Sequence, residues 1–594
     1  MNTAIRRFVR ICLIVSSPLL LLLVMLFVFA LSGAAGTLPN GVAAGDATPT
    51  SAVLWARGTI AGDVLFKYST DPSFSTDLLS VTATVTETLV PVKAAITELT
   101  PDTTYFYQVT DAANASADGQ FHTAAVTGTR TGLRFGVSGD WEGELAPYVS
   151  ISNAAGRSLD FFVEHGDTIV AGTATTPDGF RLKHSEVYST HLGLNTWAAL
   201  RSSTSILATI DDNDVRDNFA GGALPSENPN FSSYSGAYIN ETQLYSNALQ
   251  AFQEYNPLRN EFYGTTGDAR TANKRKLYRS NTYGNDAAVF LLDTRSFRDD
   301  QLDVPTNAFE ALQFLSDSFN LTNRTMLGAQ QLADLKAGLL QAQADGVTWK
   351  FILATSPIQN LGLIKAEDRF EGYAAERTNL LKFIKDKGIE NVVFIAGSLH
   401  GTIVNNLKYQ ESYPGVQTPT GAFEVIVGPV AIDPPSGPFG PATMLVAAST
   451  DPPIVSAAEL DYYNDIKRTR EEKDLFIEEL LNRIISPPYS LVSYDPIGLE
   501  GSEIDATLLQ GRYVATHTYG WTEFEIDQGS QVLTVTTYGI DYYTAAELET
   551  SPTDIINRMP AIVSQFVVTP TGNYVSNPPD PAARLAYLPM VLKD

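Results

Sequence analysis

Residues Phe161 to Asp167, with the sequence FFVEHGD, show the pattern that decides the fold of this chain. A short, continuous apolar run ends at residues that can hold a metal ion or orient a phosphate group. Such runs are typical of strands buried on both faces, and ligand sites collect just beyond the carboxyl ends of these strands. The stretch therefore predicts a buried strand that delivers His165 and Asp167 to a functional site.

Further runs along the chain repeat this pattern. They are Leu133–Val137 before Gly139-Asp140-Trp141-Glu142, Ser205–Ile210 before Asp211-Asp212-Asn213-Asp214, Ala287–Leu292 before Asp293-Thr294-Arg295, Phe351–Ala354 before Thr355-Ser356-Pro357, and Val392–Ile395 before Gly397-Ser398-Leu399-His400. Helical periodicity over residues 329–343 and 378–387 leads into two of these runs. Helices alternating with buried strands predict an α/β domain, and carboxylates with one imidazole at the strand ends predict a hydrolytic metal centre.

The chain divides into segments of different composition. Its 594 residues exceed the size at which one hydrophobic core keeps growing, so two or more domains are expected. Residues 38–125 alternate as short strands and predict a β-sandwich, in which Leu99–Tyr107 is similar to the tyrosine corner of fibronectin type III domains. The other segments are a second domain over 131–550, long excursions over 221–285 and 430–515 that we expect to roof its site, a hairpin over 520–527 and 531–538 at its sheet edge, and a Pro-rich tail over 551–594.

Residues 1–36 predict export. Arg6, Arg7 and Arg10 precede an apolar run that small residues follow. The run is long enough, at roughly 20 residues, to span a bilayer, so a cleaved signal peptide and a membrane anchor through residues 8–31 both stay open. We expect a protein that is secreted or anchored on the outer face of the cytoplasmic membrane.

The charge of the chain excludes some partners. With 66 acidic and 40 basic residues, the net charge of −26 repels nucleic-acid backbones, so nucleic acid is not expected as a structural partner. Any phosphate site needs local metal ions or clustered arginines to reverse this field. The single cysteine, Cys12, lies in the export segment, so a metal centre in the mature protein must use oxygen and nitrogen donors.

The ordered motifs resemble those of calcineurin-like metallophosphoesterases. Asp140-x-Glu142, Gly166-Asp167, Asp211–Asp214 and Gly397-x-x-His400 follow the order of that superfamily's Asp-x-His, Gly-Asp, Gly-Asn-His-Glu/Asp and Gly-His-x-His motifs. The stretches that resemble blocks of the alkaline phosphatase D (PhoD-like) branch are Gly41–Asp46, Tyr255–Arg259, Leu277–Arg279 and Leu292–Arg298. This resemblance implies a fibronectin III-like β-sandwich followed by a four-layer α/β/β/α metallophosphoesterase domain, with phosphomonoesterase or phosphodiesterase activity.

The resemblance also implies a set of site residues. Two or more divalent or trivalent metal ions are expected, with Asp167 bridging two of them and Asp140, Glu142, Asp212 and His400 as further ligands. Water held between the ions would ionise as a metal-bound hydroxide and attack phosphorus in line with the departing alcohol. The remaining expected roles are leaving-group assistance by Asn213 and binding of the phosphoryl oxygens by Arg279, Arg295 and Arg298.

The chain departs from the family pattern at several positions. Glu142 and Asn213 stand where the family has His, Val170 where many members have Tyr, Ser138 or Gly139 where they have a Cys ligand, and Ser398 where they have Asp. An amide cannot deliver a proton, and general acid catalysis is typically worth about 10² to 10⁴ in rate. One hypothesis is therefore an active centre rich in oxygen ligands that uses Ca²⁺, Mg²⁺, Mn²⁺ or ferric iron. The alternatives are a cell-surface binding protein without turnover, and an enzyme that cleaves lipid or wall-polymer phosphodiesters.

Some of these residues also have simpler explanations. Asp211 and Asp214 are more often helix caps or salt-bridge partners than ligands. His165 fits a metal ligand and a buried structural histidine equally well. Arg295 and Arg298 could pair with the nearby Asp293, Asp299 or Asp300 instead of with phosphate.

Overall fold

The computed structural model describes residues 37–362, 366–434, 437–450, 453–487, 490, 494 and 496–572. The predicted export segment, residues 1–36, and the end of the predicted tail lie outside the described residues. Within the described ranges, no helix combines the length and apolar character needed to cross a membrane.

The amino-terminal part forms a β-sandwich with its own apolar core. Its strands are β1 (Val42–Gly45), β2 (Ser51–Ala56), β3 (Gly62–Ser69), β4 (Leu79–Val85), β5 (Val92–Thr97), β6 (Thr104–Thr110) and β7 (Ser116–His122). β4, β3, β6 and β7 form one sheet, while β1, β2 and β5 face it. The Tyr105 hydroxyl accepts a hydrogen bond from the backbone N–H of Thr100 at 2.9 Å, as expected for a tyrosine corner.

The second sheet of this sandwich continues into the large sheet of the rest of the chain. β1 pairs in parallel with β10, and the resulting ten-stranded sheet has the order β17-β21-β20-β19-β8-β9-β10-β1-β2-β5. The further strands are β8 (Leu133–Ser138), β9 (Phe161–His165), β10 (Ser205–Thr209), β17 (Ala506–Gly511), β19 (Thr518–Ile526), β20 (Leu533–Asp541) and β21 (Ala561–Val568). The FFVEH stretch is the strand β9, which lies between β8 and β10 with every residue buried.

A seven-stranded sheet packs face to face with the ten-stranded sheet. Its order is β11-β12-β13-β14-β16-β15-β18, from β11 (Arg279–Tyr283), β12 (Ala287–Leu291), β13 (Trp349–Ala354), β14 (Val392–Ala396), β15 (Thr402–Tyr409), β16 (Thr418–Ile426) and β18 (Val514–Ala515). Apolar side chains from both sheets form one core between them. In that core, Phe135 stacks on Phe161 at 4.7 Å between ring centroids and meets Phe351 edge-on at 4.9 Å.

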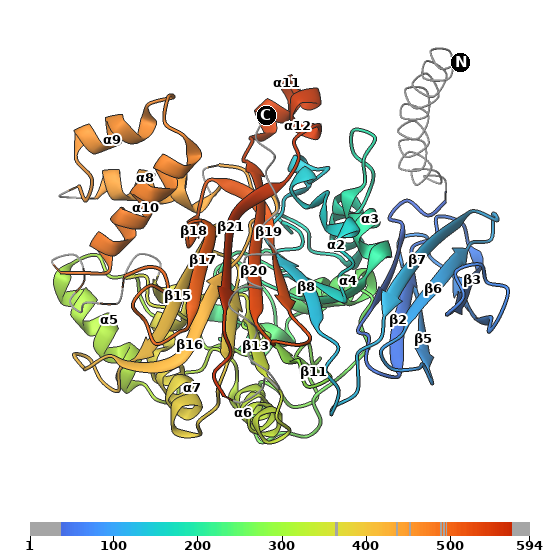
Figure 1. Ribbon diagram of the computed structural model, residues 1–594, viewed down its shortest axis with the longest axis horizontal. Coiled ribbons are helices and arrows are strands. Elements are labelled where there is room, and N and C mark those ends of the chain that lie inside the picture. Colours follow the sequence, from blue (N-terminus) through green and yellow to red (C-terminus); the bar gives the residue numbers. More distant parts are fainter. Residues whose placement is uncertain are drawn as a thin grey trace, which may run out of the picture.

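Helices cover the outer faces of both sheets (Figure 1). α2 (Pro177–Val187), α3 (Thr196–Ser203) and α4 (Gln243–Tyr255) pack on the ten-stranded sheet, and α6 (Ala329–Ala344) and α7 (Ala374–Asp386) pack on the seven-stranded sheet. The predicted four-layer α/β/β/α arrangement and the helices predicted over 329–343 and 378–387 are thus confirmed. The other helices are α5 (Ala308–Asn320), α8 (Phe439–Ser449), α9 (Ala457–Asn464), α10 (Arg470–Ile484), α11 (Ala545–Thr550) and α12 (Pro552–Ile556).

The carboxyl-terminal strands differ from the sequence-based expectation. The predicted hairpin forms β19 and β20, but it lies inside the sheet because β19 also pairs with β8 and β20 also pairs with β21. β21 comes from residues assigned to the tail, and it pairs on its other side with β17. Its alternate residues Ser564, Phe566 and Val568 are buried. Because its partners are remote in sequence, this strand could not be placed from its local pattern.

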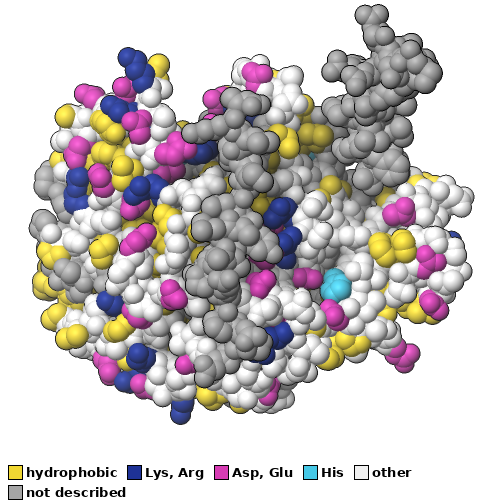
Figure 2. All heavy atoms as spheres, in the orientation of Figure 1, with side chains coloured by type: hydrophobic (Ala, Val, Ile, Leu, Met, Phe, Trp, Pro, Cys, Tyr) yellow, Lys and Arg dark blue, Asp and Glu magenta, His cyan; other side chains and the backbone are white. Residues whose placement is uncertain are grey.

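The acidic excess is not gathered into one patch on the face shown in Figure 2. Carboxylates, lysines and arginines alternate there over the described part of the surface. A group of carboxylates, Asp167, Asp211 and Asp212, is instead buried inside the protein.

Candidate metal centre

Three neighbouring parallel strands deliver the acidic residues to one edge of the ten-stranded sheet. Asp140 follows β8, Asp167 follows β9, and Asp211 and Asp212 follow β10. The first two loops are also tied together, because the N–H of Asp140 donates to the Gly166 carbonyl and the N–H of Trp141 to the Asp167 carbonyl, both at 3.2 Å. Carboxyl ends of adjacent strands therefore converge as the sequence predicts.

Asp167, Asp211 and Asp212 form a buried group in which each residue offers an oxygen within 4.8 Å of the others. Asp140 borders this group, because its carboxyl interacts electrostatically with Asp211 and Asp212. His400 arrives from the loop after β14, with its Nε2 at 3.8 Å from Asp140 Oδ1. The structure thus brings together four predicted ligands, Asp140, Asp167, Asp212 and His400, and adds Asp211.

The backbone at this site adopts an unusual conformation. The φ angles are 61° at Asp140, 48° at Asp167, 60° at Ser398 and 62° at His400, all in the left-handed region. Residues with a β-carbon rarely adopt it, and such strain persists where the surrounding structure enforces it, often at functional sites. One contact that holds these loops is the Ser398 N–H, which donates to Asp140 Oδ2 at 3.3 Å.

The carboxylates oppose one another electrostatically. Burial, followed by the neighbouring carboxylates, raises the pKa of Asp140 and of Asp167 well above the usual range. Burial also raises the pKa of Asp212 to about 6, although Arg295 acts to lower it. Nearby cations would relieve this repulsion.

The donor set fits such cations. Asp140 Oδ1 and Asp211 Oδ2 are buried and accept no hydrogen bond from the described residues. Buried polar atoms in native proteins nearly always have a partner, so these two oxygens suit the binding of a cation. Carboxylate oxygens with one imidazole suit Ca²⁺, Mg²⁺, Mn²⁺ or iron.

Asn213 lies against Asp167. Its backbone N–H donates to Asp167 Oδ1 at 3.0 Å, and its side-chain amide donates to Asp167 Oδ2 at 2.8 Å. Both contacts favour the ionised form of Asp167. The amide therefore orients the carboxylate that we expect to bridge the metal ions.

Arg295 is fully buried and is surrounded by carboxylates. Its Nε bonds to Asp211, while Nη1 and Nη2 donate to the two oxygens of Asp368 at 2.8 and 2.9 Å. Nη2 also lies 3.8 Å from Asp212 Oδ1. The guanidinium thus neutralises protein carboxylates, as the simpler explanation predicts, but its partners are the remote Asp211 and Asp368 and not the carboxylates close to it in sequence.

Asp368 was not evident from the sequence because it lies in an irregular segment outside the ordered motifs. This segment contains the short helices η6 (Ala366–Asp368) and η7 (Phe370–Tyr373). Burial acts to raise the pKa of Asp368, but Arg295 and Arg298 outweigh it and lower the pKa to about 2. The carboxylate is therefore ionised.

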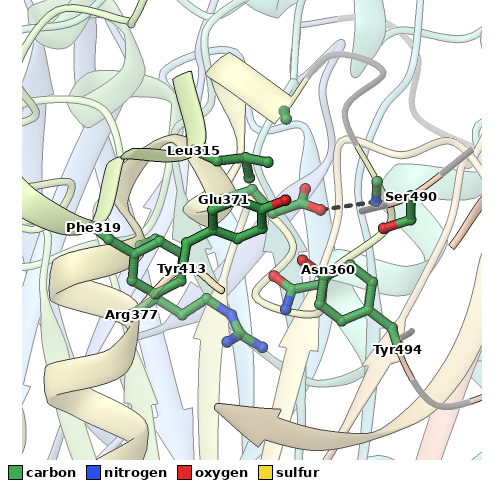
Figure 3. A pocket seen from close by; sticks show the side chains of 11 residues that line it. Leu315, Phe319, Asn360, Glu371, Arg377, Tyr413, Ser490 and Tyr494 are labelled. Atoms are coloured by element: carbon green, nitrogen blue, oxygen red, sulfur yellow. Dashed lines mark hydrogen bonds between the residues drawn. The ribbon is translucent and has the colours of Figure 1, made fainter. Parts of the chain in front are cut away.

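Glu371 anchors the same segment. It accepts hydrogen bonds from the N–H groups of Leu361 and Gly362 at 2.7 and 2.9 Å, and it pairs with Arg369. Figure 3 shows Glu371 among the side chains that line the adjoining pocket. The adjoining pocket, lined partly by Arg377, has a volume of about 30 Å³. That is room for one or two water molecules, so we assign it a packing role rather than substrate binding.

The other predicted arginines lie away from the carboxylate group. Arg298 Nη2 is 3.2 Å from Asp368 Oδ1, an oxygen of the carboxylate that also binds Arg295. Arg279, at the start of β11, binds Asp46 with its Nε at 3.1 Å from both carboxylate oxygens. Arg279 and Arg298, which we expected to bind phosphoryl oxygens, thus form ion pairs with Asp46 and Asp368.

Glu142 also lies outside the group. Its carboxylate accepts a hydrogen bond from the Asp433 N–H at 3.2 Å, and its charged neighbours are Asp433 and Glu144. The turn after Trp141 directs it away, because the Glu142 N–H pairs with the Ala431 carbonyl at 3.0 Å. Spacing alone could not show this direction.

Two further residues, Asp214 and His165, are buried beside these carboxylates. Asp214 accepts from the N–H groups of Thr168 at 3.0 Å and Asp211 at 2.9 Å, so it shapes the turn. His165 is buried, and burial lowers its pKa to about 4, which keeps the ring neutral. A neutral ring is common to metal ligands and to buried structural histidines, so both interpretations of His165 stay open.

Comparison with known proteins agrees with this architecture. The PhoD-like phosphatase family model matches residues 137–469, and the model of the N-terminal domain of PhoD-like phosphatases matches residues 30–125. Alkaline phosphatase D of Bacillus subtilis (strain 168) is 27% identical over 405 residues, covering 62% of this chain and 65% of that protein, slightly less than two thirds of its length. A solved structure of PhoD has a TM-score of 0.62 and 18% identity, covering 91% of this chain and 94% of that chain, which shows a shared fold. This chain belongs to the PhoD-like phosphatase family.

Proposed function

We propose that this protein is an exported, metal-dependent hydrolase of phosphoric esters, acting on phosphomonoesters or phosphodiesters. The observation that carries the proposal is the convergence of Asp140, Asp167, Asp212 and His400 around one buried acidic group. Membership of the PhoD-like phosphatase family supports a phosphate ester as the substrate. Bound metal ions would supply Lewis acidity and lower the pKa of an attacking water.

The exposure of the side chains indicates where the substrate approaches. The His400 side chain is 18% exposed, whereas the side chains of Asp140 and Asp212 are 1% and 7% exposed and Asp167 is buried. We therefore place the phosphoryl group on the His400 side of the carboxylates. There Asn213 would hold Asp167 in position. His400 would contact a metal ion or the leaving group.

The pattern of residues 1–36 supports export, with either secretion or anchoring on the outer face of the cytoplasmic membrane. Amino-terminal sequencing of protein recovered from culture medium and from membranes separates the two. A mature protein that begins after the small-residue stretch indicates cleavage, and an intact amino terminus in membranes indicates an anchor.

The catalytic proposal is tested by bound metal and hydrolysis. Purified protein is analysed by plasma mass spectrometry and assayed with p-nitrophenyl phosphate and bis-p-nitrophenyl phosphate, beside Asp167→Asn and the exposed control Asp217→Asn. We expect wild type and Asp217→Asn to bind metal and hydrolyse an ester, and Asp167→Asn to lose both. Wild-type protein without metal and without turnover above Asp167→Asn would instead support a binding protein.

A further inference from the structure

We propose that Asp368 is a positioning residue for the metal centre: it holds the Arg295 guanidinium so that this cation does not occupy the Asp212 oxygens that a metal ion requires. The inference rests on the metal centre of the proposed function. It gives Arg295 the role of an internal counter-charge and assigns a role to a residue outside every ordered motif.

The geometry shows a cation divided between carboxylates. Asp368 binds both terminal nitrogens of Arg295, at 2.8 and 2.9 Å, in the parallel two-bond arrangement that is strongest for a guanidinium and a carboxylate. The remaining nitrogen, Nε, bonds to Asp211. Asp212 Oδ1 lies 3.8 Å from Nη2, just beyond hydrogen-bond distance.

This arrangement matters because a guanidinium and a metal ion compete for the same oxygens. Arg295 is fully buried, so its charge is poorly screened by water. Without the Asp368 charge, its terminal nitrogens would lose their two-bond partner. Asp212 is the carboxylate that a small rotation would bring within bonding distance, at the expense of a metal ligand.

Asp368 is itself held independently of Arg295. Gln301 Nε2 donates to Asp368 Oδ1 at 2.6 Å, and Arg298 Nη2 lies 3.2 Å from the same oxygen. The bonds of Glu371 to the N–H groups of Leu361 and Gly362 fasten the rest of the segment. Asp368 is therefore a fixed acceptor to which the guanidinium is aligned, as expected of residues that orient metal ligands from outside the coordination sphere.

The test compares Mn²⁺ binding by the full chain and by Asp368→Asn, using isothermal titration calorimetry after removal of metals. We expect the Kd for Mn²⁺ to increase about 10- to 100-fold, the usual effect of losing such an orienting partner. Asp303→Asn, an exposed carboxylate before α5, is the control for loss of one negative charge and should bind as wild type does. Circular dichroism of the same samples shows whether each variant is folded.

A folded Asp368→Asn variant with wild-type Mn²⁺ affinity would overturn the inference. If Asp368→Asn does not fold, the inference is tested with Arg295→Lys, which keeps the positive charge but cannot make the two parallel bonds. Unchanged Mn²⁺ affinity in Arg295→Lys would also overturn the inference. Wild-type protein that binds Mn²⁺ but hydrolyses no ester would refute the proposed activity and leave this inference standing. Wild-type protein that binds no Mn²⁺ would refute the inference itself.

Discussion

Gly139 lies beside the carboxylate group at a position that has no room for a side chain. A β-carbon at this position would lie 2.6 Å from the His165 carbonyl oxygen and 3.0 Å from the Gly166 carbonyl oxygen. Both atoms are backbone atoms of the loop that carries Asp167, so neither can move without moving that ligand. The neighbouring Ser138 points its hydroxyl to the Gly520 carbonyl at 2.8 Å. The structure therefore excludes a side-chain ligand at 139 and directs residue 138 elsewhere.

Gly139→Ala is expected to reduce the free energy of unfolding by about 1–3 kcal/mol, the usual cost of forcing extra volume into a packed site. The reason is the contact with fixed backbone described above. Urea denaturation measures the change, and Gly156→Ala is the matched control because its β-carbon would meet no atom within 4 Å. Equal midpoints for the two variants would contradict the expectation.

At the scale of elements, one ion pair joins the sandwich to both large sheets. Asp46 follows β1 of the ten-stranded sheet, is fully buried, and binds Arg279 at the start of β11 of the seven-stranded sheet. It also accepts the backbone N–H of Arg259 at 2.8 Å. Arg279, which we expected to bind a phosphoryl group, thus links β11 to the end of β1, which belongs to both the sandwich and the ten-stranded sheet.

Asp46→Asn is expected to destabilise the protein by about 3–5 kcal/mol, because it breaks a buried ion pair and leaves Arg279 with the more distant Glu261, at 3.8 Å, as its charge partner among the described residues. Differential scanning calorimetry of the metal-free protein measures this effect. Asp63→Asn on β3 is the control, since Asp63 is exposed and bonds only to Thr84 among the described residues. If Asp46→Asn unfolds at the same temperature as Asp63→Asn, the pair of Asp46 and Arg279 does not link these elements.

At the scale of the whole molecule, the sandwich and the catalytic layers share hydrogen bonds rather than only a surface. β10 is buried along its full length and has β1 as its partner on one side. An expressed fragment of residues 131–572 would leave this strand with an open edge, and open edges promote aggregation. We expect size-exclusion chromatography to show aggregates for 131–572 and a monodisperse species for 37–572. A monodisperse 131–572 fragment that binds Mn²⁺ as the longer one does would contradict this expectation.

The buried acidic group also links stability to pH across the whole molecule. Burial raises the pKa of Asp212 to about 6 and that of Asp214 to about 7, above the values of an unfolded chain. The folded state therefore holds more protons than the unfolded state between about pH 4 and 7. The stability that these groups contribute is present at low pH and is lost as pH rises through 6 to 7.

In metal-free protein, the contribution of these carboxylates to the free energy of unfolding should decrease between pH 5 and 7.5. Mn²⁺ should stabilise the protein more at the higher pH, because the carboxylates that bind it are ionised there. Thermal unfolding with and without Mn²⁺ across this range measures both effects. Stabilisation by Mn²⁺ that is the same at every pH would show that these carboxylates do not take part in binding.

The sequence by itself predicted the buried strands β8, β9, β10, β12, β13 and β14, the helices α6 and α7, and the strand ends at which ligands collect. Local periodicity distinguishes a buried strand from a helix, and parallel neighbouring strands must end at a common edge. Asp140, Asp167, Asp212 and His400 lie beyond these strand ends, the resemblance to the family's motifs implies that they are ligands, and the structure brings them together.

Only the tertiary structure decided which charges neutralise which. Asp368 and Arg295 are 73 positions apart, Asp46 and Arg279 are 233 apart, and the direction of Glu142 depends on a loop near Ala431. These partners depend on long-range strand pairing and on side-chain direction, which local patterns do not encode. The physical reason is that burial makes an unpaired charge costly wherever its partner lies in the sequence, so the folded chain as a whole, and not any one segment, selects the pairs.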